Sequence, residues 1–329
     1  MDTRPWNGDM RTKGKWADWR SRFSTIILSH NQAQKFHKTT YVTDEFGKYV
    51  LTKILKLKPD HIYTDIENVR WSPWVRNADE VWAWGKFVTY QRMARDGIEH
   101  SVHLDDDFIL WQSVKRHLQR GSIFQSPENC SGERRGAYLR YLWLIQEVFK
   151  SNTIYSKQLK SCIPKEWFEY AMLPLDKQVA NCVSIMYLKD KKCLADYADK
   201  TIHLCRTFGQ DLSDFIYESS IVAQGIGESE RYNALCEHEG LQASFSNVQL
   251  NCFFEQWGLS AFMHSHKIKS HYIFNSESEI RYKKGTGVHH VWGGATKLEY
   301  CKRLNNKAKE MYPQHFPIEP TTINEYNAI

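Results

Sequence analysis

The order of apolar and polar positions predicts short strands that alternate with helices. Short runs rich in β-branched and aromatic residues predict strands at 23–29, 39–43, 61–63, 102–110 and 122–125. Apolar residues at helical spacing predict one helix that follows Gly47 through Leu55 and another over 78–93. This alternation favours an α/β fold with a mixed, mostly parallel sheet flanked by helices.

The second half of the chain gives a weaker pattern. An amphipathic helix is expected at 136–150, a strand followed by a helix within 176–206, and a further helix at 227–241. The polar segment 305–329 contains several prolines and is expected to be a loosely packed tail. We therefore divide the chain into a basic, tryptophan-containing extension (1–20), a main domain (21–304) with a helical insertion at about 130–175, and a tail (305–329).

Three consecutive carboxylates, Asp105, Asp106 and Asp107, interrupt an apolar run at 101–111. Burying an unpaired charge costs several kcal/mol, so the apolar flanks argue against three bare carboxylates at this place. If the segment is extended, Asp105 and Asp107 point to the same side. Oxygen-rich sites suit Mg²⁺ and Mn²⁺, and these ions often join a carboxylate to substrate phosphates. The pattern predicts a metal site for a nucleotide diphosphate, with a solvated acidic loop as the alternative.

A second cluster of polar residues lies at 285–297 and contains four glycines, His289, His290 and Lys297. Glycines allow close approach of the backbone to a ligand. A neutral histidine can complete a metal shell, and a lysine can neutralise a phosphate. The alternative is a glycine-rich turn with incidental polar residues. If both clusters form one site, His290 should lie close to Asp107.

Composition limits the classes of protein that need to be considered. The chain has 329 residues, of which 42% are hydrophobic and 25% charged, as in ordinary globular proteins, and its net charge is +6. The sequence contains no apolar run of the roughly 18 residues that a membrane span needs, and the N-terminus has no signal-peptide pattern. We therefore expect a cytoplasmic protein, bacterial or in the host cytoplasm if viral. The basic run at 115–120 is expected to be a solvated helix face.

Taken together, the two clusters and the blocks between them resemble glycosyltransferases of the GT-A type, closest to uncharacterised bacterial and phage members. The matching blocks are Tyr41–Gly47, Trp82–Lys86, His103–Asp107, Phe124–Glu128, 181–185 and His290–Lys297. They cover roughly residues 24–300 in spaced segments. The last block has one extra residue between histidine and lysine, so either His289 or His290 could be the ligand.

This resemblance implies a GT-A-like (Rossmann-like) fold and transfer of a hexosyl or pentosyl group from a nucleotide-diphosphate sugar, such as a UDP-sugar, to an acceptor hydroxyl. It implies Mn²⁺ or Mg²⁺ as cofactor, held by Asp105, Asp107 and His290. Asp44, Lys86, Asp105 and Lys297 are the expected donor-binding residues. An inverting mechanism needs a carboxylate base, and Glu228 or Glu230 could serve.

The acceptor stays open between a glycan and a hydroxymethylated base in duplex DNA. The net charge and the N-terminal segment favour DNA, because Arg11, Lys13, Lys15 and Arg20 are interleaved with Trp16 and Trp19. A different class is also compatible with the sequence, namely a sugar- or nucleic-acid-binding protein without catalysis whose carboxylate cluster is structural.

Overall fold

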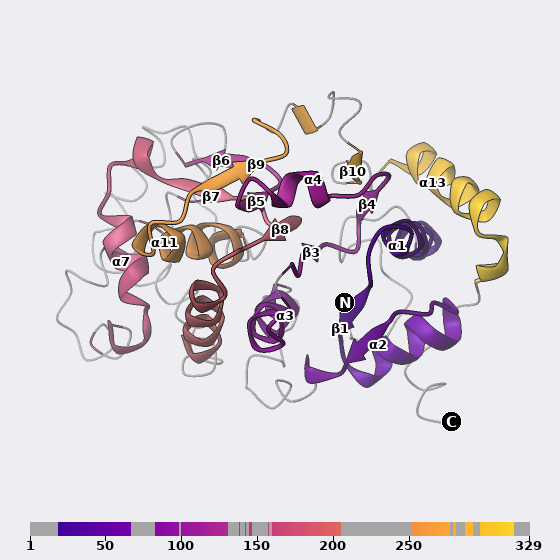
Figure 1. Cartoon of the computed structure of the whole chain (residues 1–329), viewed down its shortest axis with the longest axis horizontal. Coiled ribbons are helices and arrows are strands. Elements are labelled where there is room, and N and C mark those ends of the chain that lie inside the picture. The colour runs from indigo at the N-terminus through magenta and orange to yellow at the C-terminus, as the bar shows by residue number, and fades with distance from the viewer. Residues whose placement is uncertain are drawn as a thin grey trace, which may run out of the picture.

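The computed structural model describes residues 19–66, 83–98, 100–130, 160–204, 252–276, 287–291 and 297–318, together with 138, 142, 145, 146, 157, 279 and 280. Within these residues the protein is a mixed α/β structure with several small sheets (Figure 1). The α/β class expected from the alternating pattern is confirmed at this level.

The first half of the chain alternates short helices and short strands. The elements are α1 (Trp19–Gln34), β1 (Thr40–Val42), α2 (Glu45–Tyr49) continued by the π-helical η1 (Val50–Ile54), β2 (His61–Tyr63), α3 (Trp84–Arg95), β3 (His103–Leu104), β4 (Phe108–Leu110), α4 (Lys115–Leu118), β5 (Ser122–Phe124) and β6 (Pro127–Asn129). The predicted strands at 39–43, 61–63 and 122–125 and the helix after Gly47 are confirmed.

The second half adds strands to the same sheets. It contains α7 (Lys165–Ala171), the 3₁₀ turn η4 (Leu175–Lys177), β7 (Val179–Asn181), β8 (Ile185–Tyr187), a helical segment at 191–204, the π-helical η5 (Phe253–Trp257), α11 (Gly258–Ser265), β9 (Ser270–Tyr272), β10 (Val288–His290), α13 (Leu298–Met311) and the 3₁₀ turn η6 (Pro313–His315). The described positions of the helix expected at 136–150 are helical, while the helix expected at 227–241 lies outside the described residues.

The central sheet has the order β3-β8-β5-β9, and β1-β2, β10-β4 and β6-β7 form separate pairs. Only β1-β2 and β5-β9 are parallel among the described pairings. The other four pairings are antiparallel. The expectation of a mostly parallel sheet is therefore wrong for the described strands, because the pattern of a single strand carries no information about the direction of its partner.

Residues 23–29 form part of helix α1, so the predicted first strand is wrong. Phe23, Ile26 and Ile27 are buried and lie three and four positions apart, which puts them on one helical face. They pack in a core shared with α2, η1 and α13. The β-branched content of this run was a weaker signal than its helical spacing.

The predicted domain boundaries are shifted at both ends of the chain. Helix α1 begins at Trp19, so the boundary at residue 20 falls inside a helix, and residues 1–18 lie outside the described part. Helix α13 crosses the predicted boundary at 304, and Tyr312, His315 and Ile318 are buried. Residues 305–318 are thus part of the folded core and not a loosely packed tail.

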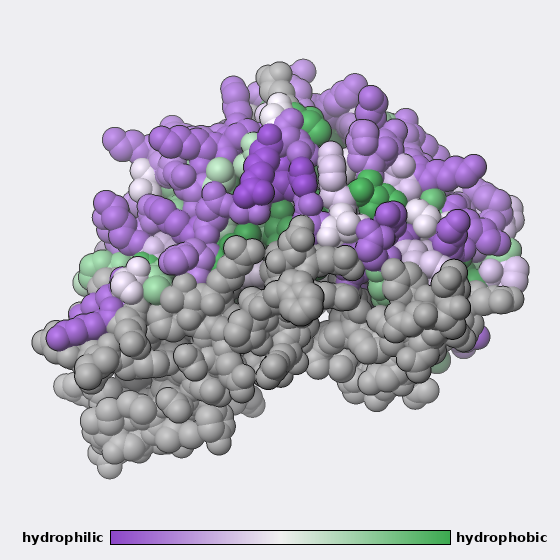
Figure 2. Space-filling model, turned by 90° about the horizontal axis from the view of Figure 1, so that it is seen from below, coloured by the Kyte–Doolittle hydropathy of each residue, from purple (hydrophilic) through white to green (hydrophobic). Residues whose placement is uncertain are grey.

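The described part of the face seen in Figure 2 is mainly hydrophilic, with apolar residues in scattered patches. Large apolar side chains instead fill three internal clusters. Within the described residues, no helix combines the length and apolar character needed to cross a bilayer. The candidate site is a small set of buried and half-buried charged residues on α3, η5, β10 and the turn between β3 and β4.

Candidate functional site

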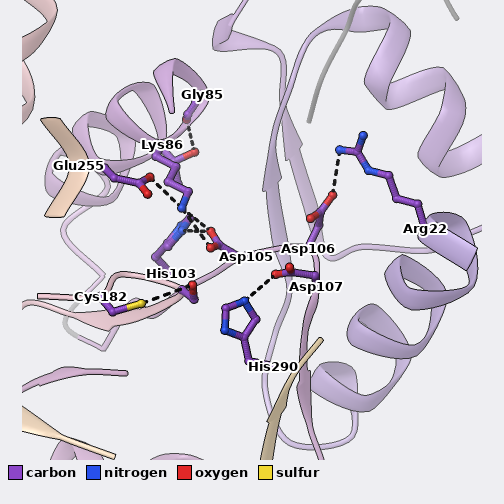
Figure 3. Close-up of polar contacts among 12 residues, drawn as sticks. Arg22, Gly85, Lys86, His103, Asp105, Asp106, Asp107, Cys182, Glu255 and His290 are labelled. Atoms are coloured by element: carbon purple, nitrogen blue, oxygen red, sulfur yellow. Dashed lines mark hydrogen bonds and ion pairs between the residues drawn. The ribbon is translucent and has the colours of Figure 1, made fainter. Parts of the chain in front are cut away.

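The three consecutive carboxylates lie in a turn between β3 and β4, not in one continuous strand. The turn is closed by a hydrogen bond from the Phe108 N–H to the Asp105 carbonyl at 3.1 Å, and the Asp105 N–H donates to the Ser184 carbonyl on the central sheet at 2.9 Å. Because the backbone turns here, the three side chains face different partners (Figure 3). This arrangement reduces their mutual repulsion, and the extended backbone on which the expectation for Asp105 and Asp107 rested is replaced by a turn.

Asp105 is held by two basic side chains. The Lys86 ammonium group on α3 lies 2.8 Å from its Oδ1 and 3.0 Å from its Oδ2. The His103 Nε2 lies 3.0 Å from Oδ1. Burial works to raise the pKa of Asp105, but Lys86 and His103 together hold it well below its usual range. Asp105 is therefore ionised and fully engaged with the protein itself.

Glu255 on η5 is the second carboxylate that contacts Lys86, at 2.9 Å. Its side chain is almost fully buried. Burial raises the pKa of Glu255 to about 7, although Lys86 opposes this shift. Burial also works to lower the pKa of Lys86, but Asp105 and Glu255 raise it well above its usual value. Lys86 therefore stays cationic and does not fit the role of a neutral nucleophile.

The π-helical turn η5 also directs Gln256 to a neighbouring carboxylate, Glu128 on β6. The Tyr138 hydroxyl donates to Glu128 Oε2 at 2.6 Å, so its only proton is used. The Gln256 amide must then donate to Tyr138 Oη at 2.9 Å and to Glu128 at 3.1 Å. Segments with i→i+5 hydrogen bonds are rare and often occur at functional sites. Here the π-turn presents two consecutive polar side chains to one buried centre.

A substitution of Glu255 tests this centre through stability. Between about pH 4.5 and 7 the unfolded chain has released the Glu255 proton and the folded protein has kept it. The free energy of unfolding contributed by this group therefore falls as pH rises across this window. In Glu255→Gln we expect this pH-dependent loss of stability to disappear. The variant should therefore gain stability relative to the wild type as the pH rises from about 5 to 8. Urea unfolding at several pH values measures the free energy of unfolding of both proteins. If this free energy depends on pH in the same way in the wild type and in Glu255→Gln, the pKa of Glu255 is not raised.

Asp107 meets His290, a residue far away in the sequence. Strand β10 pairs with β4 so that His290 lies opposite Phe108, and the Val291 N–H donates to the Asp107 carbonyl at 3.0 Å. The His290 Nε2 is 3.4 Å from Asp107 Oδ1. The neighbouring His289 points to the Tyr300 hydroxyl on α13 instead. The expected proximity of His290 and Asp107 is confirmed, and of the two histidines it is His290 that faces the carboxylates.

The geometry fits two of the three expected metal ligands. Two ligand atoms that bind one ion at about 2.1 Å and at right angles lie about 3 Å from each other. The distance between Asp107 Oδ1 and His290 Nε2 is 3.4 Å, which is close to this value. Asp105 does not join them, because both of its oxygens are bound by Lys86 and His103. Across the described residues no group of three His, Cys, Asp or Glu side chains is arranged as a metal site. Two protein donors can still suffice for an ion that is also bound by phosphates and water.

Asp106, the middle carboxylate of the turn, forms an ion pair with Arg22 on α1. The Arg22 Nη2 lies 3.3 Å from Asp106 Oδ2 (Figure 3). This ion pair joins the turn to the first helix. Asp106 is therefore directed away from the pair formed by Asp107 and His290 and serves as an internal comparison for them.

The other predicted site residues lie in different settings. Asp44 is buried and caps helix α2, with its Oδ1 accepting a hydrogen bond from the Gly47 N–H at 2.6 Å. Lys297 is exposed and directly precedes α13. Glu228 and Glu230 lie outside the described residues. Of the four expected donor-binding residues, the structure brings only Lys86 and Asp105 into contact.

Sequence reasoning missed Glu255 and Arg22. Glu255 lies in the segment Phe253–Trp257, where a carboxylate interrupts an aromatic run. The argument applied to the three aspartates, that a charge within an apolar run needs a partner, applies equally to this glutamate. Arg22 gives no such signal, since one basic residue near the start of a helix is ordinary.

Comparison with known proteins gives one match. Residues 5–167 match a family of unknown function (DUF6734). The matched part contains Asp44, Lys86 and the three carboxylates of the turn, whereas Glu255 and His290 lie beyond it. No curated protein and no solved structure matches the chain.

Proposed function

We propose that the protein is a metal-dependent glycosyltransferase of the GT-A type, which moves a hexosyl or pentosyl group from a nucleotide-diphosphate sugar, such as a UDP-sugar, to an acceptor hydroxyl. The observation that carries this proposal is the contact between Asp107 and His290 at 3.4 Å. The two residues come from the two sequence blocks on which the resemblance rests, and only the fold brings them together.

In this proposal Asp107 and His290 would hold Mn²⁺ or Mg²⁺, which when bound would neutralise charge on the departing diphosphate. Lys86 has a different role from the one expected from the sequence. Its charge is shared between Asp105 and Glu255, so it fixes the turn that carries Asp107. Lys297 is exposed and free of these ion pairs, which suits contact with a phosphate. Glu228 and Glu230 stay candidates for a base.

The acceptor in this proposal is a glycan or a hydroxymethylated base in duplex DNA. The argument for DNA rests on the net charge of +6 and on the basic N-terminal segment, whose residues 1–18 lie outside the described part. A cytoplasmic location fits either acceptor.

A binding protein without catalysis is the second candidate, and one observation favours it. Asp105 is engaged by Lys86 and His103 within the fold, as a purely structural carboxylate would be. A sugar- or nucleic-acid-binding protein would bind its ligand without consuming a nucleotide sugar.

Donor hydrolysis separates the two candidates. The full chain is incubated with a panel of nucleotide sugars, with Mn²⁺ or with a chelator, and release of the nucleotide diphosphate is measured. We expect one donor to be hydrolysed only when the ion is present, and faster when the correct glycan or modified DNA is added. Binding of a donor without hydrolysis under all these conditions would favour the binding protein.

A further inference from the structure

Basic side chains gather at one end of the central sheet, away from the carboxylate turn. They come from the end of α1, from α4 and its C-terminal flank, and from the segments next to β5, β8 and β9. All are exposed: Lys35, Lys38, Lys115, Arg116, Arg120, Lys189, Lys267 and Lys269. We call this set the basic platform.

Several contacts join these segments into one surface. The His37 Nε2 after α1 lies 3.4 Å from the Ser113 hydroxyl before α4. Strand β5 pairs in parallel with β9, with Ser122 opposite Ser270. The Lys189 N–H donates to the Ser122 hydroxyl at 3.3 Å. The lysines and arginines therefore belong to neighbouring segments, as the position of α4 beside β5 and β9 in Figure 1 also shows.

The registers of the sheet place this platform opposite the candidate site. The Asp105 N–H bonds to Ser184, which directly precedes β8, whereas Ser122 at the start of β5 bonds to Lys189, which lies just beyond β8. The carboxylate turn and the platform thus lie at the two ends of β8. Substitutions in the platform should leave the candidate site intact.

Among the described residues, the basic side chains of the platform outnumber the carboxylates beside it. These carboxylates are Asp60, which acts on Lys38, and Asp190 and Asp196, which lie 3.8 Å and 3.6 Å from His266. Burial, together with the neighbouring Lys115, lowers the pKa of His37. Burial, with Arg116 and Arg120, lowers the pKa of His117. Trp111, at the end of β4 that leads to α4, is 39% exposed.

We propose that the basic platform docks the protein onto an anionic phospholipid membrane. Lysines near a membrane surface are attracted by acidic lipid headgroups, and tryptophan favours the interface between headgroups and acyl chains. Exposed basic residues spread over several neighbouring elements suit the extended anionic surface of a membrane, and Trp111, which precedes α4 in the chain, adds an exposed aromatic side chain. Since the platform lies at the far end of the sheet, docking leaves the Asp107–His290 pair open to its ligands.

Sedimentation with vesicles tests this proposal on the full chain. We expect binding to vesicles of phosphatidylcholine mixed with phosphatidylserine and none to phosphatidylcholine alone. Raising the salt concentration from roughly 0.05 M to 0.5 M should release the protein, because the screening length shortens. This salt test needs no substitution and therefore no assumption about the folding of a variant.

A pair of charge reversals locates the surface. Lys115→Glu with Arg120→Glu should weaken vesicle binding by about thirtyfold or more, given the contribution of each basic residue near a membrane. Lys53→Glu with Lys302→Glu is the matched control, since it changes the net charge equally at exposed positions on η1 and α13. The control should bind almost as the wild type does.

Three results would overturn the proposal. The first is equal binding to vesicles with and without phosphatidylserine, and the second is an equal loss in both double variants. The third is binding to duplex DNA but not to vesicles, which would assign the platform to nucleic acid. None of these results depends on donor hydrolysis, so the docking proposal and the glycosyltransferase proposal can fail independently.

Discussion

Asp107→Ala is expected to lower donor hydrolysis and sugar transfer by roughly a hundredfold or more, a loss typical of removing one group that stabilises charge in a transition state. The fold should survive. The Asp107 side chain is partly exposed and its contact in the structure is with His290, while its backbone carbonyl keeps the hydrogen bond from Val291. Steady-state kinetics with Mn²⁺ and thermal unfolding of the same preparation measure the two effects.

The control for this substitution is in the same turn. Asp106→Ala removes a neighbouring carboxylate whose partner is Arg22 on α1. We expect it to change turnover by less than about threefold and stability by about 1 kcal/mol or less, because such partly exposed ion pairs contribute little. Wild-type turnover in Asp107→Ala with Mn²⁺, or equal losses in both variants, would remove the assignment of Asp107 as a metal ligand.

The pairing of Asp107 with His290 was the part of the site that the sequence predicted best. Charged and glycine-rich clusters within apolar surroundings carry a local signal, since desolvation demands a partner for each charge. The strands at β1, β2 and β5 were predicted for a similar reason, because short β-rich runs with turn residues at their ends are local features.

Features that depend on distant partners were not predicted. Asp105 and Asp107 were assigned to one extended strand, but the chain turns there because Asp105 and Asp107 bind different partners, Lys86 and His290. Glu255 reaches Lys86 only because the fold brings η5 close to α3, and a sequence pattern does not show this proximity. The antiparallel partners of β4 and β8 are likewise set by contacts between segments far apart in the chain.

Lys86→Met should destabilise the protein by about 3–5 kcal/mol, the usual cost of removing one member of a buried ion pair. The lysine is the shared partner of Asp105 and Glu255, at 2.8 and 2.9 Å, and its side chain is 14% exposed. Methionine fills a similar volume, so the loss reports the unpaired carboxylates and not a cavity. Equilibrium unfolding in urea measures this loss. Lys165→Met is the control, because Lys165 pairs with Glu169 at 3.5 Å while the two side chains are 77% and 55% exposed, and it should lose about 1 kcal/mol or less.

The pH dependence of this loss identifies the carboxylate that causes it. Without Lys86 the buried Glu255 can take up a proton, and its pKa in the wild type is already raised to about 7. The destabilisation in Lys86→Met should therefore be smaller at about pH 5 than at about pH 8, where a second negative charge stays buried. Adding Glu255→Gln to Lys86→Met should restore part of the stability at the higher pH and little at the lower one. If the double variant is no more stable than Lys86→Met at about pH 8, Glu255 does not share the charge of Lys86, and the turn that carries Asp107 is held by the Lys86–Asp105 pair without it.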